Sequence, residues 1–170
     1  MGMSSHTASL DGYVPFDAER RERYTAAGYW HDLTFHDLVD RWAESTPEET
    51  AVVGPHRELT YADLAANSKR IAAYIRGELG LRPNERIVLQ LPNCVEFLEL
   101  FVACSRIGVI PVMVLPRHRE AEVAHVTELT DARAHVVNYD QYPATFDFAA
   151  LAKTVAADHD SLDHLIVVTD

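Results

Sequence analysis

The sequence lacks most of the short patterns that mark catalysis. Its seven glycines are scattered, and none belongs to a glycine-rich run ending in Lys, which a phosphate-binding loop requires. There is no G-x-S-x-G turn, no pair of histidines four residues apart and no C-x-x-C pair, which are the usual marks of a nucleophilic serine or a zinc site. We therefore predict no catalytic, cofactor-binding or metal-ligating residue within these 170 residues.

Charge and hydropathy exclude several classes of partner. The 26 acidic side chains outnumber the 15 basic ones and give a formal net charge of -11, so neither nucleic acid nor an anionic membrane is expected to bind. No apolar run reaches the roughly 18 residues of a membrane helix, and the opening residues MGMSSHTASL lack the pattern of a signal peptide. Cys94 and Cys104 lie about 15 Å apart along one expected helix, too far for a disulfide. We expect a cytoplasmic protein with free thiols.

Turn residues and hydrophobic periodicity divide the chain into three expected parts. An N-terminal arm with one short helix precedes a helix, a hairpin and a second helix. Thr34 is expected to cap the first of these two helices, a Gly-Pro turn joins the hairpin strands, and Thr60 with Asp63 forms a capping box for the second helix. An α/β crossover region completes the chain. The three parts are expected over residues 1–33, 34–84 and 85–170.

In the third part, short apolar runs alternate with helical segments. The runs are rich in Val and Ile and too short for helices, so they predict buried strands, at residues 86–91, 109–115, 134–138 and 164–169. Asn93 is expected to cap the first intervening helix, with Glu96 three residues later; the second runs from Arg119 to about Thr130, and the third lies within residues 146–157. The predicted fold class is α/β: N-terminal helices and a hairpin, followed by a β-α-β-α-β-α-β segment with a mainly parallel sheet.

A basic patch, PRHRE, follows the second of these strands. It stands where the carboxyl end of the strand enters the next helix, which is the edge at which α/β proteins place their binding loops. One interpretation is therefore that this patch takes part in binding. An alternative is purely structural: Arg117 and Arg119 pair with nearby acids of the following helix, such as Glu120 and Glu122, and the histidine fills an ordinary helix entry.

Four segments together carry a resemblance to a known family. Two of them are HDLVDRWAESTPEETAVVGPHRELTYADL and LGLRPNERIVLQLPNCVEFLELFVACSRIGVIPV, and the shorter ones are RYTAAGYWHDLTFHDLV and VLPRHRE. The first two resemble the opening part and the first two core motifs of the adenylate-forming superfamily, the acyl and aryl acid ligases and adenylation domains. The shorter two are typical of stand-alone aryl acid ligases that activate 2,3-dihydroxybenzoate or salicylate for siderophore assembly. Asn84 stands where the family usually has Gly, and Asn tolerates a left-handed backbone there.

This resemblance implies a reaction and its partners. Enzymes of the family react a carboxylate with Mg-ATP to give an acyl-adenylate and pyrophosphate, and then transfer the acyl group to a thiol. For the full-length enzyme, ATP and Mg2+ are therefore expected, with an aryl acid and the phosphopantetheine of an aryl or peptidyl carrier protein as partners. The family's Lys-ended loop, acid pocket, ribose-binding Asp and C-terminal-domain Lys are expected beyond the last residue here. Because VLPRHRE resembles a feature of the aryl acid ligases, the resemblance makes His118 the candidate residue on the substrate side.

Two hypotheses of function remain at this point. In the first, the chain is the N-terminal segment of an aryl acid-AMP ligase that loads a carrier protein in siderophore or nonribosomal peptide biosynthesis. In the second, the polypeptide ends near Asp170 and is a non-catalytic scaffold or one half of a split enzyme. Under both, the isolated chain is expected to be inactive, because the groups that position and stabilise the reacting atoms are absent from it.

Overall fold

The computed structural model describes residues 14–138 and 146–169. The helices in these residues are α1 (Ala18–Ala26), α2 (Phe35–Ser45), α3 (Tyr61–Gly77), α4 (Val95–Ile107), α5 (Glu120–Thr130) and α6 (Phe148–Ala157). The strands are β1 (Thr50–Val53), β2 (Glu58–Thr60), β3 (Arg86–Gln90), β4 (Ile110–Met113), β5 (Ala134–Asn138) and β6 (His164–Val168). No helix in these residues is both long and apolar enough to cross a bilayer.

The contacts within the chain define two compact units, Met1–Leu33 and Thr34–Asp170. In the described part of the first unit, the carboxylate of Asp17 accepts a hydrogen bond from the N–H of Arg20 and caps α1. The arm therefore contains the short helix that its charged run predicts. The second unit holds the remaining elements, and α2, α3 and α4 pack together within it.

Four strands of the second unit form a parallel sheet in the order β4-β3-β5-β6. The mixed α/β class and the mainly parallel sheet predicted from the sequence are both confirmed. The chain moves outward from β3 to β4, returns past β3 to β5 and continues to β6. Parallel crossovers are right-handed, so reversing direction sends the connecting helices to opposite faces of the sheet. The hairpin β1–β2 is a separate antiparallel pair, with the Gly-Pro turn where the sequence predicts it.

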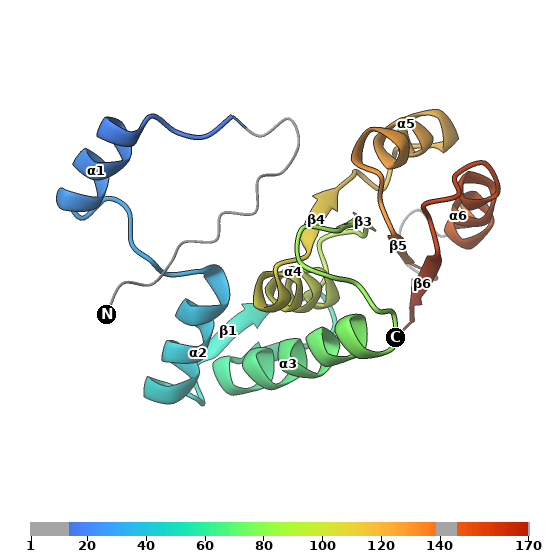
Figure 1. Ribbon diagram of the computed structural model, residues 1–170. Helices are drawn as coiled ribbons and strands as arrows, with labels where there is room; N and C mark the ends of the chain where they lie inside the picture. Colours follow the sequence, from blue (N-terminus) through green and yellow to red (C-terminus); the bar gives the residue numbers. More distant parts are fainter. Residues whose placement is uncertain (1–13, 139–145, 170) are drawn as a thin grey trace. The chain divides into compact units, whose positions relative to one another are not determined.

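Alternate side chains of β3 and β5 pack against different helices. Toward α3 and α4 point Ile87, Leu89, Ala134 and Val136, which form one cluster with Ile75, Leu100 and Cys104. Toward α5 and α6 point Val88, which packs with Val126, and Val137, which packs with Phe148 and Ala152. The sheet is thus covered on both faces, as the apolar runs predict, and Figure 1 shows α3 and α4 on one side of it and α5 and α6 on the other.

Helix α4 begins one residue later than the sequence predicts. Its N-cap is Cys94, with an extended backbone (φ -130°, ψ 165°), so the prediction that Asn93 caps this helix is wrong. The N–H of Cys94 donates to the carbonyl of Pro92 at 2.9 Å, and this turn leaves Asn93 outside the helix. The carboxylate of Glu96 lies 2.8 Å from the guanidinium of Arg57, in the hairpin turn.

Helix α3 begins as the sequence predicts. The Thr60 hydroxyl accepts from the N–H of Asp63 at 3.1 Å, and the Asp63 carboxylate accepts from the N–H of Thr60 at 3.1 Å, which is the predicted capping box. Beyond its end, Gly80 has a left-handed backbone (φ 70°), and the N–H of the next residue reaches the carbonyl of Ile75 at 3.2 Å. Asn84 has φ 72°, so it adopts the left-handed conformation expected of it.

The β4 edge of the sheet is closed to further strands. The N–H of Ile110 donates to the carbonyl of Glu85, just before β3, and that of Val114 donates to Leu89 of β3, so the N–H groups at the alternate positions point to the free edge. Of these positions, Pro111 has no N–H, and the N–H of Leu115 donates to Nδ1 of His118 at 3.3 Å. A strand that approached this edge would find no continuous row of donors.

The β6 edge is open. The N–H of His164 donates to the carbonyl of Arg133 at 3.2 Å, so the N–H groups of Leu165 and Val167 point away from β5. The side chains of Leu165 and Val167 are 37% and 40% exposed. No proline interrupts the strand, HLIVV. In residues 14–138 and 146–169, β5 is the only strand that pairs with it. This edge has the donors, acceptors and apolar side chains that a further strand would use.

Candidate functional site

The carboxyl ends of β3, β4 and β5 meet at one edge of the sheet. Strand β3 leads to α4 on one face, whereas β4 and β5 lead to α5 and α6 on the other face. Neighbouring strands whose helices go to opposite faces leave a crevice between their loops, and open α/β sheets bind ligands there. His118, the candidate from the sequence, lies half-buried at this edge, in the turn between β4 and α5.

The turn of residues 115–119 is closed by two hydrogen bonds of its own. The N–H of His118 donates to the carbonyl of Leu115 at 3.0 Å, and the N–H of Leu115 donates to Nδ1 of His118 at 3.3 Å. A neutral imidazole that accepts at Nδ1 carries its proton on Nε2. Within the described part of the chain, Nε2 has no hydrogen-bond partner. The ring therefore retains one free donor.

Gln90, the last residue of β3, ties this turn to the neighbouring strand. Its side chain is fully buried, and its Nε2 donates to the carbonyl of His118 at 3.1 Å and to that of Leu115 at 3.4 Å. Its Oε1 has no partner in the residues that the structure describes. An unpaired buried acceptor costs about 1–3 kcal/mol. The buried amide of Gln90 thus destabilises the core, but its hydrogen bonds fix the position of the turn.

Arg119 fastens the same turn from the side of α5. Its Nη1 donates to the carbonyls of Pro116 and His118, both at 2.9 Å, and its guanidinium lies 3.9 Å from the ring centroid of Phe146, just before α6. The backbone N–H of Arg119 donates to the Glu122 carboxylate at 3.0 Å and lowers the pKa of that group. We refer to Gln90, His118 and Arg119 as the turn clamp, because their contacts join the ends of β3 and β4 to the start of α6.

The structural alternative for the basic patch is right about the helix entry, because Arg119 is the N-cap of α5, but the ion pairs that it predicts are not formed. In the described residues, no ion pair joins the guanidinium of Arg117 or Arg119 to Glu120 or Glu122. Arg117 is exposed, and Arg119 donates to backbone carbonyls instead. The turn also forms one wall of a cavity of about 400 Å³ at the ends of β3 and β4, lined by Leu91, Pro92, Asn93, Phe97, Met113, Val114, Leu115 and Pro116.

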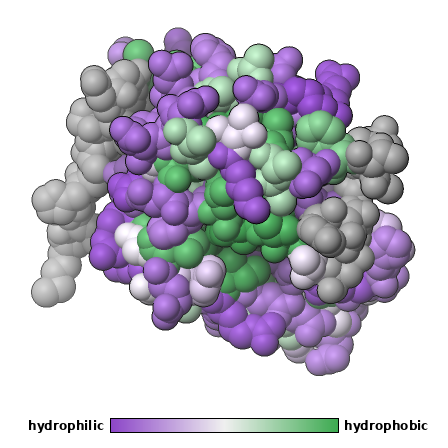
Figure 2. Space-filling view, turned by 90° about the vertical axis from the view of Figure 1, so that its right-hand side faces the viewer, coloured by the Kyte–Doolittle hydropathy of each residue, from purple (hydrophilic) through white to green (hydrophobic). Residues whose placement is uncertain are grey.

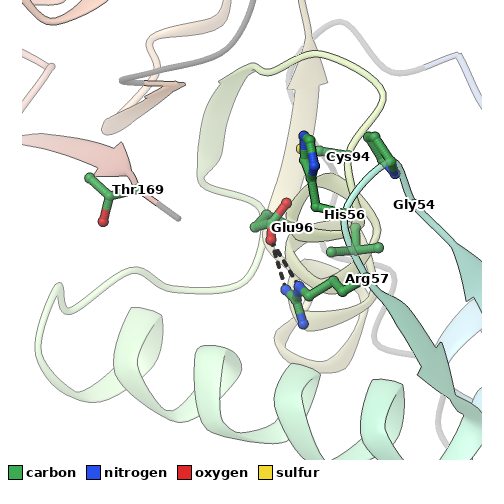
Figure 3. Close-up of a pocket in the computed structure, with 8 residues that line it drawn as sticks. Gly54, His56, Arg57, Cys94, Glu96 and Thr169 are labelled. Carbon is green, nitrogen blue, oxygen red and sulfur yellow. Dashed lines mark hydrogen bonds and ion pairs between the residues drawn. The ribbon is translucent and has the colours of Figure 1, made fainter.

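A larger cavity, of about 580 Å³, lies between the hairpin turn, the start of α4 and the end of β6 (Figure 3). Its lining residues are Gly54, Pro55, His56, Arg57, Cys94, Val95, Glu96 and Thr169. Thr169 stands apart from the hairpin turn in Figure 3, at the end of β6. A Cβ placed on Gly54 would lie 2.7 Å from Cγ1 of Val95, so only glycine lets the hairpin turn approach α4 this closely.

Arg57 forms ion pairs with two carboxylates beside this cavity. Its Nη2 lies 2.8 Å from Oε1 of Glu96 and 2.9 Å from Oε2 of Glu99, and Figure 3 shows the Glu96 contact. Glu99 is buried and also accepts from Nδ2 of Asn67 at 2.5 Å. Burial alone would raise the pKa of Glu96, but the hydrogen bond from Arg57 and its other hydrogen bonds outweigh burial and lower that pKa. These groups join the hairpin, α3 and α4; they are not arranged as an acid–base pair.

The two cysteines are free and are poor nucleophiles. Burial raises the pKa of Cys94 to about 11 and that of Cys104 to about 12. The thiolate is the reactive form of cysteine, so both residues remain thiols at neutral pH. The larger cavity, which Cys94 lines, can therefore hold a ligand without attacking it.

An apolar groove of about 240 Å³ lies beside β6. It is lined by Ile71, Tyr74, Ile75, Glu96, Glu99, Leu100, Ile166 and Val168. Figure 2 looks at the side of the molecule that carries β6 and α6, and there apolar side chains gather at the centre with polar ones around them. The open edge of β6 and this groove thus belong to one apolar face.

Sequence reasoning proposed His118, whose role stays a prediction, but did not identify the residues that contact its turn. Gln90 was read only as part of an apolar run, and its contacts reach 25 and 28 residues along the chain, where no local pattern reports them. The larger cavity was also missed, because its walls come from three separate segments. Among the described residues, no group of three or more His, Cys, Asp or Glu could hold a metal ion.

Comparison with known proteins gives one consistent result. Residues 39–170 match the family described as AMP-binding enzyme. The chain is 39% identical to a salicyl-AMP ligase / salicyl-S-ArCP synthetase of Mycobacterium tuberculosis, over 98% of this chain and 30% of that protein. It is 34% identical to a 2,3-dihydroxybenzoate-AMP ligase of Bacillus subtilis, over 92% of this chain and 27% of that protein.

Solved structures show the same likeness in three dimensions. The apo structure of MbtA from Mycobacterium smegmatis superimposes with a TM-score of 0.84 and 37% identity, over 94% of this chain and 29% of that one. The chain thus spans about 30% of the length of the curated relative from Mycobacterium tuberculosis. What it matches in each case is one part of a longer polypeptide.

Proposed function

Because the chain belongs to the family of AMP-binding enzymes, we propose that it is the N-terminal segment of an ATP-dependent aryl acid-AMP ligase. The observation that carries this proposal is similarity to a salicyl-AMP ligase along nearly the whole chain. The full-length polypeptide would convert salicylate or 2,3-dihydroxybenzoate and Mg-ATP into an aryl-adenylate and pyrophosphate. It would then transfer the aryl group to the phosphopantetheine thiol of a carrier protein, in the cytoplasm, for siderophore or nonribosomal peptide synthesis.

In this reaction, the segment supplies part of the fold and the loops at the carboxyl edge of the parallel sheet. It has no glycine-rich loop for phosphates, its described residues offer no metal-binding group, and its two thiols stay protonated at neutral pH. The donors present thus do not suit Mg-ATP. We propose that the residues that bind Mg-ATP lie in the part of the polypeptide that corresponds to the remaining length of the relatives, and that residues 1–170 alone are inactive.

Pyrophosphate exchange tests the proposal directly, because it reports adenylate formation without a carrier protein. The full-length polypeptide that contains these residues should exchange labelled pyrophosphate into ATP when salicylate or 2,3-dihydroxybenzoate is added, and not with a long-chain fatty acid. Residues 1–170 should show no exchange. A full-length polypeptide that exchanges with no aryl acid would contradict the proposal, and exchange by residues 1–170 alone would contradict the inactivity of the segment.

The open edge of β6 is the observation that favours the split-enzyme hypothesis. If the gene ends near Asp170, a second chain must supply the strand beside β6 and the missing donors. Mixing residues 1–170 with a separately expressed partner would then restore exchange in proportion to the complex formed. If the gene continues and the full-length product is active by itself, the split-enzyme hypothesis is wrong.

A further inference from the structure

We propose that the open edge of β6 and the apolar groove beside it are the docking surface for a later segment of the same polypeptide, which adds a further parallel strand to the sheet. This inference rests on the proposal that the chain is the N-terminal segment of a longer polypeptide, but not on the reaction proposed for that polypeptide. It assigns an occupant to an apolar face that the described residues leave without a partner.

Strand β6 has the side chains of an interior strand. The last four residues of its sequence, HLIVV, are all apolar, so both of its faces are apolar: Ile166 and Val168 lie on the side of α3 and α4, and Leu165 and Val167 lie on the other side. Continuous apolar runs are typical of strands that a parallel sheet covers on both faces. Edge strands instead carry charges, prolines or bulges that oppose pairing, and β6 contains no Lys, Arg, Asp, Glu or Pro and pairs with β5 without a bulge.

Strand β4, at the other end of the described sheet, has the features that β6 lacks. Pro111 has no N–H to offer, and the N–H of Leu115 already donates to Nδ1 of His118. The two outer strands of one sheet therefore differ: β4 is protected against pairing, whereas β6 is suited to it. Because every described pair in this sheet is parallel and helices cover both faces of the sheet, we infer that the added strand is parallel as well.

The groove beside β6 gives the side chains of the added strand a place to pack. Its volume is about 240 Å³, and its walls include Ile71 and Tyr74 of α3, Leu100 of α4, and Ile166 and Val168 of β6. Tyr74 is 50% exposed although it lines this apolar surface. A strand that paired with β6 would point alternate side chains to the side of α3 and α4. Apolar side chains at those positions would remove the groove from water and add hydrophobic stabilisation to the backbone hydrogen bonds.

A later segment of the same polypeptide suits this surface better than a second copy of the chain. The chain covers 30% of the salicyl-AMP ligase that it matches along nearly its whole length, so a polypeptide of that size has ample residues for a crossover and a further strand. Such a segment is tethered to the end of β6 and reaches its edge at a high effective concentration. Two copies would each bring a net charge of -11, and like net charges oppose association.

Hydrogen–deuterium exchange in the full-length polypeptide tests the pairing, with the N–H groups of β6 resolved one by one. The N–H of Ile166 faces β5 and should exchange slowly with or without a further strand. The N–H groups of Leu165 and Val167 face the open edge. If a strand pairs there, they should exchange about 100-fold more slowly than the N–H of Met113, which points to the free edge of β4 and is the matched control.

Dilution identifies the occupant. Slow exchange at Leu165 and Val167 that does not change with protein concentration supports the proposal. Slow exchange that appears only at high concentration would assign the edge to a second copy and overturn it, and so would exchange as fast as that of Met113. None of these measurements needs an aryl acid or ATP. A polypeptide without aryl-acid-dependent pyrophosphate exchange would therefore contradict the proposed function and leave the result for the edge unchanged.

Proline variants of the full-length polypeptide distinguish a paired strand from a loop or helix that only covers the edge. Proline is tolerated on the free side of an edge strand but not between two paired strands. Val167→Pro should therefore lose most of the soluble, folded polypeptide, whereas Met113→Pro should retain it. Val167→Thr keeps the N–H and the branched side chain, and it should fold like the wild type. A Val167→Pro variant recovered as well as Met113→Pro would overturn the proposal, because no strand could then pair with β6 at this position.

Discussion

Arg106 of α4 and Asp40 of α2 form a two-pronged ion pair, with Nη1 2.8 Å from Oδ2 and Nη2 2.7 Å from Oδ1. The hydrogen bonds from Arg106 are the main reason that the pKa of Asp40 falls to about 2. Because this folded-state pKa lies below the ordinary value of about 3.9, the pair contributes stability above that pH. The contribution is lost as pH falls toward 2.

Arg106→Met should lower the free energy of unfolding by about 2 kcal/mol at pH 7, since it removes the buried partner of a partly buried carboxylate. The side chain of Arg106 is 9% exposed. Lys69 is the matched control, because its Nζ also lies near Asp40, at 3.2 Å, but its side chain is 60% exposed. Lys69→Met should cost less than about 0.5 kcal/mol. Equal effects in urea unfolding would mean that burial does not decide the strength of the pair.

The buried His135 of β5 should give the stability of the fold a second dependence on pH. Its side chain is fully buried and neither ring nitrogen has a partner among the described residues. Burial lowers its pKa from 6.5 to about 4. A depressed histidine pKa means that the unfolded chain binds the proton first. Stability from the neutral ring is therefore complete above about pH 6.5 and falls as pH drops toward 4.

The expected loss between these pH values is roughly 3 kcal/mol, at about 1.36 kcal/mol for each pKa unit. His135→Leu should flatten this part of the profile and raise stability at pH 5, because an unsatisfied polar ring is replaced by an apolar side chain. His125→Gln, at an exposed position of α5, should leave the profile unchanged. Urea unfolding at several pH values gives the comparison. A profile that stays as steep in His135→Leu would assign the titration to another group.

Gly54 and Gly77 should respond in opposite directions to alanine. A Cβ on Gly54 would meet Cγ1 of Val95 at 2.7 Å, whereas one on Gly77 would meet nothing within 4 Å. Gly54→Ala should cost about 1–3 kcal/mol by forcing the hairpin turn away from α4. Gly77→Ala, at the end of α3, should add up to about 1 kcal/mol. Thermal unfolding of both variants tests this, and a neutral Gly54→Ala would mean that the turn can shift without loss.

Residues 1–170 on their own should associate through the edge formed by β6. Val167→Lys should reduce this association and the binding of a hydrophobic dye, because a charge on an open edge opposes strand pairing. Met113→Lys on β4 should change neither, although Met113 is 59% exposed, since that edge is already closed. Sedimentation velocity at several concentrations measures the difference. If the two lysine variants behave alike, exposed apolar area and not the open edge drives association.

The fold was largely predictable because its signals are local. The capping box of Thr60 and Asp63 and the apolar runs of β3 and β5 depend on residues close together in the chain. The contact of Glu96 was not predictable, because its partner Arg57 lies 39 residues earlier in the chain. In the candidate site, the sequence singled out only His118, and its role stays a prediction. Gln90 alternates with apolar neighbours in a buried strand, and nothing nearby in the sequence indicates which carbonyls it meets.

The closed edge of β4 affects where new termini and fused segments can be placed in this polypeptide. Pro111 and the hydrogen bond from Leu115 to His118 leave that side without a continuous row of donors, so a reporter or linker attached nearby should remain outside the sheet. A linker with strand-forming residues placed directly after β6 would compete for the open edge. Circular permutants and fusions that keep the segment after β6 continuous, and place new termini on the β4 side, should therefore fold more readily than the reverse arrangement.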